Sequence, residues 1–202
     1  MRLGVHVSIA GGLEEAVSRA KRLGCTTMQI FSRSPRGGPA PRLSMEQADG
    51  FHAARQKAGV EPLAIHGPYI INLASPVKAR WAQSVALYQE EYARALLLRA
   101  QYLVTHVGSH LGEGEEAGVL RVAEALTRTL ESRTPTTMIL LENTAGSGQG
   151  LGYRFEQLAE IRAQVTRKAH VGICLDTAHL FAAGYPIHTE SGLKQTVAEF
   201  DR

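Results

Sequence analysis

The chain has 202 residues, of which 44% are hydrophobic, and its 22 basic and 19 acidic side chains give a net charge of +3. These values predict one globular domain with a substantial core, and no apolar run approaches the roughly 18 residues of a membrane span. Residues 1–6 form a strand-like run without the features of a signal peptide, so we expect a cytoplasmic protein with no membrane partner. Cys25 and Cys174 lie among core-like residues and are expected to be reduced thiols. The mildly basic charge permits an anionic partner without requiring one.

The chain repeats a unit in which an apolar, β-prone run precedes an amphipathic helix. The expected strands cover residues 3–8, 26–32, 63–66, 102–107, 138–142 and 171–176. Ser44 and Gln47 have the spacing of a capping box, and Gly59 is placed to end that helix. Ser75 and Pro76 mark the start of a long helix. Apolar stripes define the helices after the third strand: Trp81, Val85, Tyr88, Tyr92 and Leu96; Val119, Val122, Ala123, Leu126 and Leu130; Phe155, Leu158 and Ala159; Leu193, Val197 and Phe200.

Apolar strands that alternate with helices predict a parallel α/β fold with both faces of the sheet covered. The loop after the first strand contains Gly11 and Gly12 but lacks the Gly-x-Gly-x-x-Gly pattern of a dinucleotide-binding turn. Polar residues with metal-binding side chains instead end several different strands. This distribution is expected of a TIM (β/α)₈ barrel, whose active site lies at the carboxyl ends of its strands.

The strand-end residues suggest a metal site. They are His6, His66, His106, Glu142 and Asp176, with His179 three residues after Asp176. A single histidine in such a place is more often a hydrogen-bonded structural residue, and an Asp-x-x-His pair is often a helix cap. Several converging strand ends favour a mixed His and carboxylate site for zinc, with manganese or iron as alternatives. Neighbouring ions bridged by a carboxylate could hydrolyse a phosphodiester.

Five segments of the chain, in order, resemble the endonuclease IV family of zinc-dependent abasic-site endonucleases. They cover residues 5–12, 66–73, 106–110, 142–146 and 176–185, of which the last two match the family most specifically. The resemblance implies a barrel of the xylose isomerase-like type with a trinuclear zinc centre. It also implies hydrolysis of the phosphodiester 5′ to an abasic site in double-stranded DNA, leaving a 3′-hydroxyl.

The resemblance further implies roles for individual residues. His66, His106 and Glu142 would bind one zinc, and Glu142 would be the catalytic residue that bridges to a second zinc held by Asp176. His179 would bind a third zinc. In the loops after the second and third strands, the positions of Arg36, Tyr69 and Ile70 match residues that enter the minor groove of DNA. Alternatively, Arg33, Arg36 and Arg42 belong to a solvated loop, and Tyr69 packs on the barrel rim.

Six β/α units account for residues 1–202, which we interpret as a single incomplete barrel domain. In the family, the seventh and eighth units supply another histidine, an Asp-x-His pair and a glutamate, and these 202 residues hold no counterpart. We therefore expect about one zinc per chain instead of three, with manganese as a possible substitute. Members of the family are usually monomeric, but open sheet edges could allow this chain to self-associate. The alternative functions are a metal-dependent sugar isomerase or epimerase of the same barrel superfamily and a non-catalytic, DNA-binding remnant.

Overall fold

A computed structural model describes all 202 residues and contains one sheet of six parallel strands arranged in chain order. Each strand pairs with the next one along the chain. The strands are β1 (Gly4–His6), β2 (Thr27–Phe31), β3 (Leu63–His66), β4 (Tyr102–His106), β5 (Met138–Glu142) and β6 (Val171–Cys174). The six predicted strands and their parallel order are therefore confirmed, with β1, β2, β4 and β6 shorter than the apolar runs that contain them.

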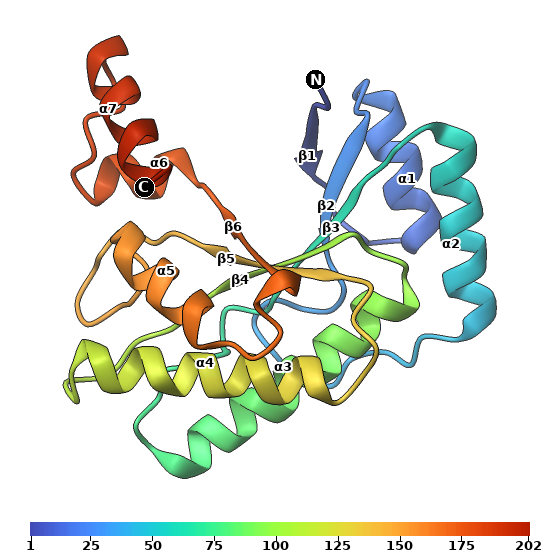
Figure 1. Ribbon diagram of the computed structural model, residues 1–202. Helices are drawn as coiled ribbons and strands as arrows, with labels where there is room; N and C mark the ends of the chain where they lie inside the picture. Colours follow the sequence, from blue (N-terminus) through green and yellow to red (C-terminus); the bar gives the residue numbers. More distant parts are fainter.

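Helices follow the strands as the alternating pattern predicts. They are α1 (Leu13–Arg22), α2 (Met45–Ala58), α3 (Lys78–Leu97), α4 (Glu115–Glu131), α5 (Phe155–Gln164), α6 (Thr177–Ala182) and α7 (Glu190–Phe200), with a short 3₁₀ turn, η1 (Lys168–His170), before β6. Figure 1 shows α1 to α5 arranged in chain order around the outside of the curved sheet, while α6 and α7 extend beyond β6. None of these helices combines the length and apolar character needed to cross a membrane.

Local sequence signals explain where α2 begins and ends. The Ser44 hydroxyl accepts a hydrogen bond from the Gln47 backbone N–H at 3.1 Å, and the Gln47 side chain accepts one from the Ser44 N–H at 3.0 Å. Gly59 ends the helix with φ 70°, a left-handed conformation that glycine adopts at little cost. The signal before α3 was less accurate, because that helix begins at Lys78, two residues after Pro76.

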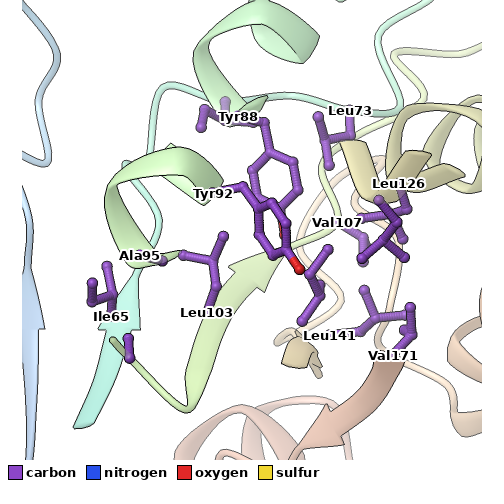
Figure 2. Packing of buried hydrophobic residues seen from close by; sticks show 14 of the residues in the cluster. Ile65, Leu73, Tyr88, Tyr92, Ala95, Leu103, Val107, Leu126, Leu141 and Val171 are labelled. Atoms are coloured by element: carbon purple, nitrogen blue, oxygen red, sulfur yellow. The ribbon is translucent and has the colours of Figure 1, made fainter. Parts of the chain in front are cut away.

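A core between the sheet and the outer helices holds the strands in place. Its cluster of 35 buried residues includes side chains from α1 to α5 and from strands β2 to β6. Figure 2 shows Tyr88 and Tyr92 of α3 directed toward the strands, near Leu103 and Leu141. The Tyr92 hydroxyl donates a hydrogen bond to the Thr137 carbonyl at 2.9 Å, which satisfies its polar end inside the core.

Helices α5 and α7 differ from the apolar stripes expected for them. In α5, Ala159 is exposed and Ile161 is buried, so the inner face of that helix is rotated from the predicted one. In α7, Leu193 and Val197 are 46% and 47% exposed, because no strand pairs with the outer side of β6 within the 202 residues to bring a neighbour over them, whereas Phe200 of the same stripe packs on Phe155 with the ring centroids 5.2 Å apart. The opposite edge, β1, likewise exposes Val5.

Candidate metal centre

The register of the sheet places three candidate ligands on its inner side. His106 and Glu142 are direct partners across β4 and β5. His66 pairs with Val104, which lies two residues before His106 and therefore on the same face of the strand. Because all three residues end their strands, their side chains project from the same rim of the sheet. The sequence pattern supplied the residue types, and the register brings them together.

Their polar atoms converge on one carboxylate oxygen. Glu142 Oε2 lies 2.9 Å from His66 Nε2 and 3.1 Å from His106 Nε2. Two ligand atoms on one tetrahedral zinc lie about 3.3 Å apart, given metal–ligand bonds of about 2 Å, so the three side chains fit such an ion with little adjustment. His66 also donates from Nδ1 to the Gly67 carbonyl at 2.7 Å, which leaves Nε2 to face the carboxylate.

Burial and charge act against each other at this cluster. Burial raises the pKa of Glu142, but hydrogen bonds and charge from His106 and His66 outweigh it and lower that pKa to about 2. Burial lowers the pKa of His66, whereas its hydrogen bonds to Glu142 and Gly67 and the Glu142 charge raise it, with a net increase. Burial, aided by nearby carboxylates, raises the pKa of Cys174 to about 11, so this thiol beside Glu142 is neutral at pH 7. The cluster therefore presents imidazoles and an ionised carboxylate.

A second group shares Glu142. Glu142 Oε1 lies 3.8 Å from His179 Nδ1, which in turn lies 3.8 Å from Asp176 Oδ2. The ligand atoms of Glu142, Asp176 and His179 all lie within 4.8 Å of one another, as do those of the first group. One Glu142 oxygen thus faces each group, while the His179 Nδ1 nearest to Glu142 is hydrogen-bonded to the Asn143 carbonyl at 2.8 Å, so Nε2 is the His179 atom left free to bind a metal.

Asp176 is the N-cap of α6, which confirms the helix-cap interpretation of the Asp-x-x-His pair and is compatible with a ligand role for the same residue. Its Oδ1 accepts from the His179 backbone N–H at 2.9 Å, and Oδ2 is left on the side of the His179 ring. His6, by contrast, belongs to neither group. Its Nδ1 accepts from the Gln29 side chain at 3.0 Å, and its ring packs on Phe31 with the ring centroids 4.4 Å apart.

The expected DNA-contacting residues occupy the rim beside these groups. Tyr69 and Ile70 are 61% and 52% exposed, and Arg36 is exposed. The Tyr69 ring nonetheless contacts the site, with its centroid 5.5 Å from that of His66 and 5.9 Å from that of His106. Phe31, which the sequence did not single out, completes this aromatic wall at 5.4 Å from Tyr69. Tyr69 therefore packs on the barrel rim and is exposed to solvent at the same time.

The loop after β2 is fixed at its start and exposed further on. Arg33 is buried and forms ion pairs with Glu90 at 2.6 Å and with the fully buried Glu91 of α3, so its assignment to a solvated loop was wrong. The buried carboxylate of Glu91 needs a cationic partner, which explains why this arginine turns inward. Gly37 approaches Ile70 so closely that a β-carbon there would lie 2.7 Å from the Ile70 side chain. The loops carrying Arg36 and Ile70 therefore lie against each other.

Comparison with known proteins first gives the class. A family described as xylose isomerase-like TIM barrels matches residues 17–201. A D-tagatose 3-epimerase-like protein of known structure superposes with a TM-score of 0.69 over 95% of this chain and 72% of its own, at 20% identity, which supports the shared fold alone. The chain is thus a barrel-type α/β protein with candidate metal ligands at the carboxyl ends of its strands.

More similar proteins identify the family within that class. A probable endonuclease 4 of Chloroflexus aurantiacus is 45% identical over 202 residues, which cover 100% of this chain and 71% of that relative. The crystal structure of endonuclease IV from Thermus thermophilus has a TM-score of 0.86 and 37% identity, and the match covers 100% of this chain and 71% of that one. The chain belongs to the endonuclease IV family.

Proposed function

We propose that this chain is a DNA repair endonuclease that hydrolyses the phosphodiester 5′ to an abasic site and leaves a 3′-hydroxyl. The observation that carries the proposal is the convergence of His66, His106 and Glu142 on one point, beside a second group that shares Glu142. Membership of the endonuclease IV family supplies the reaction class. The sugar isomerase alternative is not favoured, because the epimerase resembles this chain in fold alone.

We assign the residues as follows. His66, His106 and Glu142 would hold one zinc, Glu142 and Asp176 would hold a second, and His179 would contribute to a third. Zinc bound there would stabilise charge on the attacking and leaving oxygens of the phosphodiester and make hydroxide available at neutral pH. The mixed imidazole and carboxylate ligands suit zinc, and manganese is the alternative.

Side chains and backbone groups around the site keep its candidate ligands in the ionisation state and orientation that metal binding needs. The low pKa of Glu142 keeps its carboxylate ionised over the working pH range, so both oxygens remain available as ligands. The Nδ1–H of His66 is held by the Gly67 carbonyl, which fixes the ring with Nε2 toward the site. The aromatic wall of Tyr69 and Phe31 limits water on one side of His66.

We assign the exposed residues of the two adjacent loops to the DNA. Tyr69 and Ile70 present large apolar surfaces on the rim, as a wedge that enters the minor groove requires. An abasic nucleotide has no base to unstack, so displacing it from the duplex costs less than displacing an intact one. Arg36 is exposed on the neighbouring loop and is suited to contact a phosphate or the groove.

The test is a nicking assay on a duplex with one abasic site, run beside the same duplex without the lesion. Cleavage should be confined to the abasic strand, and a polymerase should extend the product directly, since a 3′-hydroxyl needs no processing. A chelator should abolish cleavage, and added zinc should restore it. Epimerisation of a ketose without DNA cleavage would overturn the proposal, as would cleavage that persists after metal removal.

A further inference from the structure

Asn143 follows Glu142 directly and is 1% exposed. All four of its polar groups bond to the segment that carries Asp176 and His179. Its side-chain oxygen accepts from the Asp176 N–H at 2.6 Å, and its side-chain nitrogen donates to the Asp176 carbonyl at 3.2 Å. Its backbone N–H donates to the Cys174 carbonyl at 3.2 Å, and its own carbonyl accepts from His179 Nδ1 at 2.8 Å.

These bonds determine how two candidate ligands are presented. The Asn143 side-chain amide is hydrogen-bonded to both the N–H and the carbonyl of Asp176. Asp176 lies between the end of β6 and the start of α6, where no regular strand pairing or helix fixes the backbone. The carbonyl holds the His179 ring with a proton on Nδ1, which leaves the lone pair of Nε2 for a metal. A buried asparagine needs partners in any fold, but here every bond reaches a candidate ligand or the segment leading to it.

We propose that Asn143 is a positioning residue that holds Asp176 and His179 in register with Glu142 for metal binding. The inference rests on the proposed function, since it assumes that these residues bind zinc. Because His66 and His106 have no hydrogen bond to Asn143, its loss should weaken the Asp176 and His179 positions selectively. Removing an outer partner of a metal ligand typically lowers metal affinity about 10- to 100-fold.

Asn72 provides a matched control. Its side-chain oxygen accepts from the Ser109 N–H at 2.9 Å, and its side-chain nitrogen donates to the Ser109 carbonyl at 3.0 Å. Asn72 therefore joins the loops after β3 and β4 by hydrogen bonds, as Asn143 joins the segments after β5 and β6. Unlike Asn143, it makes no hydrogen bond to Asp176 or His179. Asn72→Ala removes a pair of amide bonds like the pair that Asn143→Ala removes, and also the hydrogen bond that the Asn72 side-chain oxygen accepts from the Ala74 N–H at 3.1 Å.

The experiment is a zinc titration of the whole chain, continued past the one tightly held zinc so that the weaker Asp176 and His179 positions also fill, and followed through the ring nitrogens of its eight histidines by NMR with ¹⁵N-labelled histidine. Signals are assigned from those that disappear in His66→Gln and His179→Gln. In Asn143→Ala, the His66 signals should shift at the same zinc concentration as in the unaltered chain, whereas those of His179 should need about 10- to 100-fold more. In Asn72→Ala, both sets should titrate as in the unaltered chain.

Two results would overturn the inference: an unchanged His179 titration in Asn143→Ala, or an equal weakening at His66 and His179, which would indicate a general structural role. If Asn143→Ala does not fold, the unaltered metal-free chain decides, because its neutral His179 ring should carry the proton on Nδ1 and an Nε2–H form would contradict the geometry. If zinc shifts no His66 signal in the unaltered chain, the proposed metal centre itself fails. The two failures are therefore distinguishable.

Discussion

Replacing Glu142 with glutamine tests the electrostatics of the metal centre without any metal. The Glu142 pKa is lowered from 4.5 to about 2, because hydrogen bonds and charge from His106 and His66 outweigh the effect of burial. A carboxylate whose pKa is lower in the folded state stabilises the fold above its unfolded pKa, and this stabilisation is lost as the pH falls through the folded value. The window is therefore between pH 4.5 and about 2.

The magnitude follows from the same shift. Each pKa unit corresponds to about 1.4 kcal/mol, so the ionised Glu142 should contribute on the order of 3 kcal/mol at pH 5. The group is 6% exposed, so screening by solvent is small. Burial lowers the pKa of His66, but its hydrogen bonds to Glu142 and Gly67 and the Glu142 charge outweigh burial and raise that pKa from 6.5, so its ring remains cationic throughout the window.

The free energy of unfolding is measured by denaturant for the chelator-treated chain and for Glu142→Gln. Each protein is unfolded at pH 5 and at pH 2. Other carboxylates titrate in both proteins, and their contributions cancel in the difference between them. Between the two pH values, the unaltered chain should lose about 3 kcal/mol more stability than the variant. Parallel losses in the two proteins would show that the histidines do not hold the Glu142 carboxylate in the metal-free fold, and the reasoning would be refuted.

Three further predictions concern metal, DNA and association. The 202-residue chain should bind about one zinc by elemental analysis, because three ligands can retain an ion. It should cleave abasic DNA on the order of 10²- to 10³-fold more slowly than a full-length relative, because lost charge stabilisation slows cleavage. Three bound zincs with rapid cleavage would contradict this prediction. Tyr69→Ala should weaken binding to abasic duplex, measured by fluorescence anisotropy, and leave undamaged duplex almost unaffected; equal losses would indicate a general phosphate contact. Val5→Lys, on the open edge of β1, should reduce any self-association seen by light scattering, because a lysine disfavours edge pairing; unchanged association would locate the contact elsewhere.

The sequence by itself determined the local structure and the identities of the candidate ligands. Ser44 and Gln47 cap the start of α2 and Gly59 ends it, each through contacts within a few residues. The local pattern is therefore sufficient to predict both ends of this helix. The motifs around His66, Glu142 and Asp176 indicated the family because each pairs a strand end with a specific loop. Alternating apolar runs gave the parallel sheet, since strands buried on both faces need helices to cover them.

Only the tertiary structure decided how these residues meet. Arg33 turns inward because Glu91, 58 residues away, is buried beside it. Glu142 and His66 are 76 positions apart along the chain, yet their side chains form a hydrogen bond. The register of β4 against β3 and β5 brings the two side chains together. Leu193 and Val197 have a core-like pattern but remain exposed, because burial requires a neighbour as well as an apolar face. Periodicity specifies the face on which a side chain lies, whereas its partners depend on register and packing between distant segments, which no local pattern encodes.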